Sequence, residues 1–458
     1  MTRAARSTPA KTYGACSAAG VPPRRHIPAR LLALLAFAPL AAGAAGYESP
    51  PQLAVKDLLP AEQVKSASHE VLDPVDNDGF MNTFHVASPF GRFDVEGRAL
   101  LGVRLREIGA MAQLSELSKS EVFADAVKAG VRNATVGQVE TLEAFAERPV
   151  ETLQGVPAGV SRMFKRTKAQ AKEAYGEVQR QREEQGDAEE GGSGEDPADK
   201  AADATKNYAV KYFGVSSAER RWAQKLGVDP YTSNEQLRAM ISVVARVDAA
   251  GRFGVRFLGI PGIPGIGTVR KVNDLVWETD PYELKLRNQK LLAACGADEE
   301  TARRFFENHW LSPTLQTAIT NALESMSGVE GRAALVAQAA AVESETAAWF
   351  VTENALLAAW YHAQRTPIAR LLPGGAAAAA VTADGRAVIL AATDHVVWTG
   401  DLEAAATRFK QQAAAQEARG LEVGFAGTVS PRAVTELGAL GYTVSGELAA
   451  EIRAAAGG

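Results

Sequence analysis

The chain has 458 residues, with 49 Lys and Arg against 54 Asp and Glu, for a formal net charge of -5. Hydrophobic residues make up 46%, a fraction typical of globular proteins, which excludes disorder over the whole chain. The acidic balance argues against a dedicated nucleic-acid-binding protein, and two cysteines cannot build a disulfide scaffold or a cysteine-rich zinc site. The length predicts two or three domains.

The first 44 residues predict an export signal. Arg24, Arg25 and Arg30 precede an uncharged apolar run over 31–42, and small residues follow it, with the simplest cleavage site after Ala44. The run is shorter than the roughly 20 residues of a membrane span, so cleavage is favoured over a retained N-terminal anchor. The flanking residues fit general secretion better than a twin-arginine signal. We therefore expect an exported protein, periplasmic or secreted after cleavage.

Cleavage would change the composition of the protein. Residues 1–44 hold six basic side chains and no acidic one, so the mature chain has 43 basic against 54 acidic side chains, a formal -11. Cys16 would be lost, which leaves Cys295 as the single cysteine and rules out an internal disulfide. The apolar sequence around Cys295 favours a buried side chain over a reactive thiol.

The mature chain is predicted to divide into four regions. Residues 45–184 hold an extended lead-in over 46–80, a β-hairpin and a helical region. Residues 185–207 are rich in Glu, Asp and Gly and read as a flexible acidic linker, with a partner-binding tail as the alternative. Residues 208–372 form a helical domain and 373–458 a small module. The expected fold class is mainly α, with a C-terminal α/β (α+β) module and one short N-terminal hairpin.

The N-terminal elements follow from local patterns. Residues 84–88 and 92–96 alternate around a Pro/Gly turn, which predicts the hairpin. From Arg98 the apolar residues recur at helical spacing and predict an amphipathic helix. Further helical patterns follow over 120–127 and 139–145.

Capping residues mark the helices of the middle domain. Caps are predicted at Ser216 or Ser217, Asp280, Asp298 and Ser312, two of them followed by Pro at the first helical position. Another helix of this domain is predicted to begin near Asp229 or Ser233. In the C-terminal module, a helix is predicted to begin at Asp401. The Ala-rich pattern over 328–362 predicts one long helix.

The C-terminal module has a clear element order. Residues 379–382 and 386–390 flank Asp384-Gly385, a strong hairpin signal because the tight turn needs positive φ. Residues 396–398 extend the second strand or form a third. A helix, a strand, a helix, a strand and a final helix follow.

Candidate catalytic and metal-binding residues are sparse. The five histidines of the mature chain are His69, His85, His309, His362 and His395. No two of them have the spacing of a helical metal pair, so no metal or cofactor is expected. The acid-rich stretch ending at Gly79 fails as a calcium loop, because Pro74 and His85 would occupy ligand positions. It predicts a polar Asx-type turn instead.

The stretch from Phe257 to Val269 is uncharged and broken by two prolines. It is either a connector packed into the helical core or a loop that docks on a partner or a membrane surface. The apolar side chains of that possible docking loop are Leu258, Ile260, Ile263 and Ile266.

Two functions remain open at this point. The first is a non-enzymatic, exported helical scaffold or binding protein of a bacterial-type cell envelope, which docks an envelope protein or a membrane component. The alternative is a secreted or periplasmic hydrolase, with His309, Asp394 and His395 as candidate polar residues. Asp394 and His395 are neighbours, however, and neighbours in an extended chain point to opposite faces. Nucleic acid is not an expected partner, and the sequence does not determine the oligomeric state.

Overall fold

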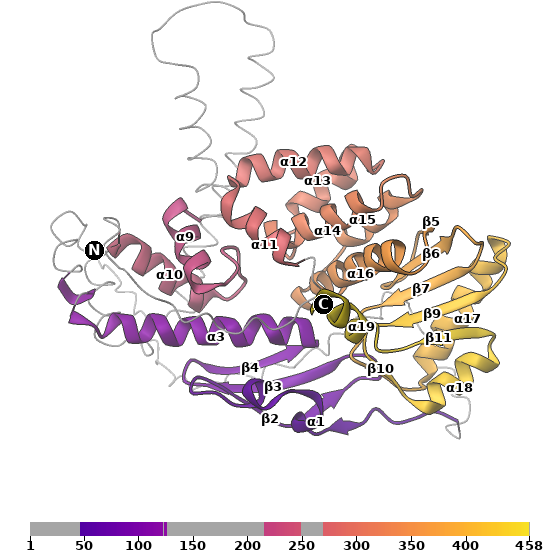
Figure 1. Cartoon of the computed structure of the whole chain (residues 1–458), viewed down its shortest axis with the longest axis horizontal. Helices are drawn as coiled ribbons and strands as arrows, with labels where there is room; N and C mark the ends of the chain where they lie inside the picture. Colours follow the sequence, from indigo (N-terminus) through magenta and orange to yellow (C-terminus); the bar gives the residue numbers. More distant parts are fainter. Residues whose placement is uncertain (1–45, 122, 126–214, 249–268, 458) are drawn as a thin grey trace, which may run out of the picture. The chain divides into compact units, whose positions relative to one another are not determined.

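The computed structural model describes residues 46–121, 123–125, 215–248 and 269–457 (Figure 1). The predicted signal segment, the acidic linker, the helical pattern over 139–145 and the possible docking loop lie outside these ranges. The described residues form a mixed α/β structure with many helices and three sheets. The expectation of a mainly α chain fits this composition only loosely.

A four-stranded antiparallel sheet replaces the single hairpin predicted near the N-terminus. Its strands, in spatial order, are β1 (Gln52–Leu53), β2 (Glu70–Asn77), β3 (Asn82–Ser88) and β4 (Gly91–Glu96). The predicted hairpin is confirmed as β3 and β4, with Phe84 opposite Val95. The prediction of an extended lead-in over 46–80 was wrong, since these residues contain β1, β2 and the short helices α1 (Val55–Leu58) and α2 (Ala61–Val64). Aspartate and proline are depleted in strands, so the sequence of β2 does not have a strand-like composition.

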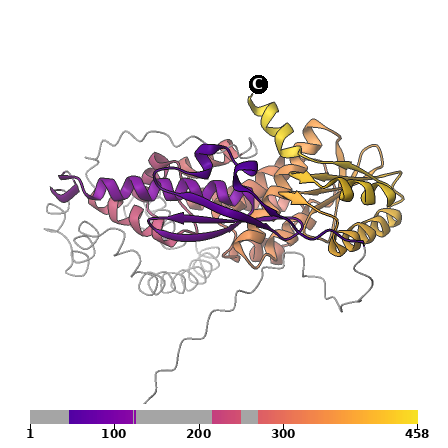
Figure 2. The ribbon, with the colours of Figure 1, turned by 90° about the horizontal axis from the view of Figure 1, so that it is seen from below.

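Helix α3 (Arg98–Ser118) forms as predicted and shares a hydrophobic core with this sheet. Leu101, Ile108 and Leu114 are buried in that core. Helices α9 (Ser217–Leu226) and α10 (Glu235–Val247) contribute Trp222, Leu237 and other side chains to it. Figure 2 shows α3 lying along the sheet.

Six further helices make up the middle of the chain. They are α11 (Val269–Glu278), α12 (Pro281–Ala294), α13 (Glu299–Glu307), α14 (Pro313–Ser325), α15 (Arg332–Ala340) and α16 (Glu345–Gln364). The four predicted caps are confirmed, because each of these side chains accepts a backbone N–H in the first helical turn: Ser216, Asp280, Asp298 and Ser312. The single helix predicted over 328–362 was wrong. A break after Ala340 separates α15 from α16, which Ser344 caps by accepting the N–H of Ala347.

The C-terminal module is a five-stranded sheet with helices on both faces. Its spatial strand order is β11 (Tyr442–Ser445), β9 (Leu421–Phe425), β7 (Ala387–Ala391), β6 (Ala378–Thr382) and β5 (Ile368–Leu372). The predicted hairpin is confirmed as β6 and β7, and β7, β9 and β11 run parallel. Strands β8 (His395–Val396) and β10 (Thr428–Val429) pair in a separate small sheet.

The alternation of side chains along β7 explains the two layers of helices. Val388 and Leu390 share a core with α16 and α19 (Leu448–Gly457). Ala387 and Ala391 share another with α17 (Gly400–Ala415) and α18 (Pro431–Ala439). The predicted hairpin, helix, strand, helix, strand and helix occur in that order, but β5 before the hairpin and β10 before α18 were not predicted. Two predicted helix starts were shifted: the caps are Thr399 for α17 and Asn234 for α10.

Backbone hydrogen bonds join the N-terminal segment to the C-terminal module. The N–H of Asp394 donates to the carbonyl of Phe80 over 3.0 Å, and that of Val397 to Gly79 over 3.2 Å. The N–H of Glu48 donates to the carbonyl of Trp398 over 2.8 Å. No helix in the described ranges has the length and apolar character needed to cross a membrane.

Candidate functional site

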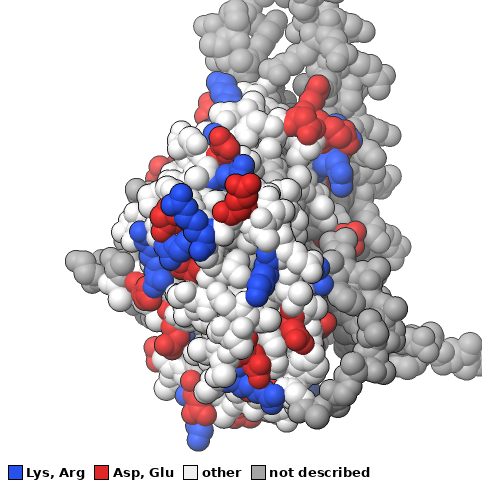
Figure 3. Space-filling model, turned by 90° about the vertical axis from the view of Figure 1, so that its right-hand side faces the viewer, with Lys and Arg blue, Asp and Glu red and all other residues white. Residues whose placement is uncertain are grey.

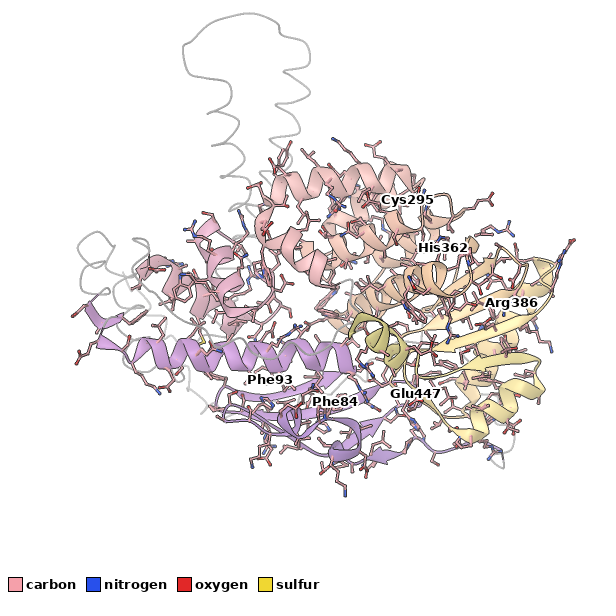
Figure 4. The ribbon with its side chains drawn as sticks, viewed as in Figure 1. Phe84, Phe93, Cys295, His362, Arg386 and Glu447 are labelled. Carbon is pink, nitrogen blue, oxygen red and sulfur yellow. The ribbon has the colours of Figure 1, made fainter. Side chains whose placement is uncertain are left out.

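The structure separates the histidines and Asp394 into different local roles. His395 Nδ1 lies 2.7 Å from Thr428 Oγ1, and burial lowers the pKa of this histidine. The Asp394 carboxylate instead accepts the backbone N–H groups of Asn82 and Arg98. His362 Nδ1, near the end of α16, accepts the N–H of Ile368 over 2.9 Å (Figure 4). Asp394 and His395 therefore do not form a dyad, as expected for neighbours in an extended chain.

The acid-rich turn between β2 and β3 is confirmed as an Asx-type turn. Asn77 Oδ1 accepts the N–H of Gly79 over 2.8 Å, and Asp78 Oδ1 accepts those of Phe80 and Met81. Among the described residues, no group of three or more His, Cys, Asp or Glu side chains could hold a metal ion. Cys295 is buried, and burial raises the pKa of its thiol.

A shallow hollow between the end of α13, the α13–α14 turn and the end of α15 is the first candidate site. It encloses about 330 Å³ and opens widely to solvent. We call it the Trp310 hollow, and its lining residues are Arg304, Glu307, Asn308, His309, Trp310, Ala340, Val342 and Glu343. Trp310 is 36% exposed, and its ring centroid lies 4.3 Å from that of His309. An exposed indole beside apolar and charged groups can contact a ligand or a partner protein.

Asn308 builds the hollow by holding the α13–α14 turn against the end of α15. Its Nδ2 donates to the carbonyls of Ala340 and Val342 over 3.2 and 2.8 Å. Its Oδ1 accepts the N–H of Trp310 over 2.9 Å. The indole therefore belongs to a turn whose backbone is held by the Asn308 hydrogen bonds. A turn that is already ordered loses less conformational entropy when a partner binds.

Four carboxyl groups influence one another electrostatically around Asp394, and we call this set the carboxyl junction. Asp78 comes from the β2–β3 turn, Glu96 from the end of β4, Glu353 from α16 and Asp394 from the segment after β7. Asp394 Oδ2 accepts the N–H of Asn82 over 3.1 Å. Both of its oxygens lie 3.2 Å from the N–H of Arg98, the first residue of α3.

Glu96, Glu353 and Asp394 have raised pKa values. Burial, followed by the charges of Asp78 and Asp394, raises the pKa of Glu96 to about 7. Burial and the charge of Asp394 raise the pKa of Glu353 to about 8. Burial also raises the pKa of Asp394, although its backbone donors and the charge of Arg98 oppose that rise. Groups with such shifts gather at functional sites, but also at structural junctions.

His309 was a candidate polar residue from the sequence, whereas Trp310 and Glu353 were not identified as candidates. The available signal for Trp310 was a large aromatic residue in a polar turn between two predicted helices. For Glu353 it was the only Asp, Glu, Lys or Arg in residues 346–361 of an Ala-rich helical pattern, a setting where an unpaired charge is rare. Glu96 gave no such signal, because its partners are brought together only by the tertiary fold.

The chain matches no protein-family model, no curated protein and no solved structure. Its function must therefore be argued from the geometry of the two candidate sites.

Proposed function

We propose that this protein is an exported, non-enzymatic binding protein of a bacterial-type cell envelope, and that it docks a partner protein through the Trp310 hollow. The observation that supports this proposal is the exposed Trp310 indole in the lining of the hollow, on a turn whose backbone Asn308 fixes by hydrogen bonds. Tryptophan in a fixed position is enriched among residues that contribute most to protein–protein affinity. Export rests on the signal sequence predicted over residues 1–44.

The charges around the hollow favour a protein partner over a polyanion. Glu307 and Glu343 line the hollow together with Arg304, so neither sign forms a continuous area there. Positive and negative side chains are also intermingled on the face shown in Figure 3. A nucleic-acid surface would require a basic patch or stripe.

Co-purification from envelope extract would test the docking surface. We expect Trp310→Ala to weaken capture of the partner about thirtyfold, which corresponds to roughly 2 kcal/mol for a central tryptophan. Val434→Ala is the matched control, since Val434 is another large exposed apolar side chain, at 43%, on α18. Equal capture by wild type and Trp310→Ala, with both proteins folded, would contradict this site.

Two further measurements test the parts of the proposal that lie outside the described residues. Sequencing of the native N-terminus should begin after Ala44, whereas an intact N-terminus on cytosolic protein would contradict export. Removal of residues 257–267 should reduce membrane recovery or change the captured partners if Leu258, Ile260, Ile263 and Ile266 form a second docking surface. Unchanged recovery and partners would exclude that loop.

A further inference from the structure

Residues 46–48, which we call the N-terminal arm, contact the C-terminal module as a peptide ligand would. The N–H of Glu48 donates to the carbonyl of Trp398 over 2.8 Å, and the N–H of Trp398 donates to Glu48 Oε2 over 2.7 Å. The Ser430 hydroxyl donates to the same carboxylate oxygen over 2.6 Å. A backbone carbonyl, a backbone N–H and a hydroxyl of the module therefore recognise a single glutamate.

The tyrosine of the arm contacts a second part of the module. The Tyr47 hydroxyl donates to the carboxylate of Glu403 in α17. The Tyr47 ring lies against Gly400, the first residue of that helix, because a Cβ atom on Gly400 would be 3.7 Å from two ring carbon atoms. The module thus recognises a tyrosine together with the glutamate that follows it, through groups at the start of α17 and of α18.

The groups that bind the arm are ordered by the module itself. Ser430 Oγ accepts the N–H of Ala433 and so caps α18. Thr399 Oγ1 accepts the N–H of Leu402 and so caps α17. The site therefore keeps its shape when the arm leaves it, and a site that is already ordered loses less entropy when a segment binds.

The arm is joined only loosely to the N-terminal sheet. Ser49 and Pro50 follow the arm, are exposed, and make no hydrogen bond within the ranges that the structure describes. The strand pairing begins at Gln52 of β1, which lies opposite Asp76. The arm can thus leave its site without breaking the sheet. Exchange of such an element between two identical chains keeps the contacts that the element makes, so it is a low-cost route to a dimer.

We propose that the C-terminal module carries a recognition site for an extended segment in which tyrosine directly precedes glutamate, and that this site binds the N-terminal arm of a second copy of this chain in exchange for its own. A second copy is the occupant that the contacts support, because it carries Tyr47 and Glu48 with the spacing that the site requires. A chain's own arm competes at a high effective concentration, so a second arm binds only after the first has left. This inference does not depend on the Trp310 hollow.

Fluorescence anisotropy of a labelled peptide of residues 46–51, titrated with the full chain, tests the recognition site. The variant Tyr47→Ala/Glu48→Ala removes both recognised side chains from the arm and leaves the site open. We expect this variant to bind the peptide about tenfold or more tightly than the wild type does, because the arm of the wild type competes. A peptide with Gln in place of Glu should bind the variant about tenfold less tightly, because it lacks the charged acceptor. Equal affinities in either comparison would overturn the site.

Sedimentation of mixed variants tests the second copy as the occupant. Ser430→Asp keeps a good N-cap for α18 but places a negative charge against Glu48, so the arm should leave its own site. This chain then offers a free arm, and Tyr47→Ala/Glu48→Ala offers an open site. We expect the two chains to form a heterodimer that neither variant forms alone.

A charge-matched variant makes the mixing test specific to the arm. Thr435→Asp adds the same charge at an exposed position of α18, five residues beyond Ser430. Its arm should stay docked, so it should form no heterodimer with Tyr47→Ala/Glu48→Ala. Absence of the heterodimer with Ser430→Asp, while both chains are folded, would overturn exchange between copies even if the peptide binds. Equal association of Ser430→Asp and Thr435→Asp would also overturn it, since the contact would then not involve the arm.

Discussion

At the scale of single residues, the pairing of β3 with its neighbouring strands raises the pKa of His85. His85 on β3 lies 2.7 Å from Asp94 of β4 and 3.1 Å from Asp76 of β2, so both ring nitrogens face a carboxylate. The hydrogen bonds to Asp94 and Asp76 raise the pKa of His85. The charged imidazole therefore stabilises the sheet below the unfolded-state pKa of about 6.5, and this contribution is lost as the pH rises through the folded-state pKa.

We expect Asp94→Asn to lower the pKa of His85 more than Asp76→Asn does, because Asp94 is the closer partner and the larger cause of the shift. The groups are partly exposed, so the loss of stability at pH 6 should stay below about 1 kcal/mol. NMR titration of the imidazole carbon protons measures the pKa directly. A pKa unchanged in Asp94→Asn would show that the two groups do not interact in solution.

At the scale of elements, the turn after β9 shows why one glycine is needed beside the junction. A Cβ atom on Gly427 would lie 1.9 Å from the carbonyl oxygen of Asp394, so the two backbone segments can approach only without a side chain. The N–H of Thr428 also donates to that carbonyl over 3.1 Å. Gly427 therefore positions Asp394 through direct backbone packing.

Gly427→Ala should destabilise the protein by roughly 2–4 kcal/mol, because backbone must move to remove the clash. Gly438→Ala in α18 is the matched control: no atom lies within 4 Å of its added Cβ, and alanine favours the helix. It should leave the protein as stable or raise stability by up to about 1 kcal/mol. Urea unfolding of both variants measures the difference, and equal free energies of unfolding would refute the packing argument.

The same scale shows what sequence patterns can predict. Caps such as Asp280 and Ser312, and the Asp384-Gly385 hairpin, depend on residues within one turn, so their local signals were sufficient. Strand β2 was missed because its stability comes from pairing with β3, which outweighs the poor strand preference of its acids and Pro74. The break between α15 and α16 was missed because alanine and valine continue the helical pattern through it.

At the scale of the whole molecule, both candidate sites lie where chain segments distant in sequence meet. No local pattern indicates that Phe80 will pair with Asp394, or that Asn308 will bind the end of α15. His309 and Asp394 are therefore recognisable as candidates from the sequence, but the residues that surround them are not. The contact of Asn308 with the end of α15 and the carboxyl junction both depend on tertiary contacts.

Glu48 offers a test of how much the long-range contacts at the start of the described chain contribute to stability. Its Oε2 accepts the N–H of Trp398 over 2.7 Å and the hydroxyl of Ser430 over 2.6 Å. The same hydroxyl accepts the N–H of Ala433 and so caps α18. Glu48 thus orients a helix cap more than 350 residues away along the chain.

Glu48→Ala should lower the free energy of unfolding by about 2–3 kcal/mol, because the buried Ser430 hydroxyl and the Trp398 N–H lose a charged acceptor. Glu48→Gln keeps an acceptor oxygen without the charge and should lose about half as much. Glu62→Ala, at an exposed position on α2, should change stability by less than about 0.5 kcal/mol. Equal stability of Glu48→Ala and Glu62→Ala in urea unfolding would contradict this prediction. The backbone hydrogen bond from Glu48 to Trp398 would then be enough to hold the N-terminal segment in place.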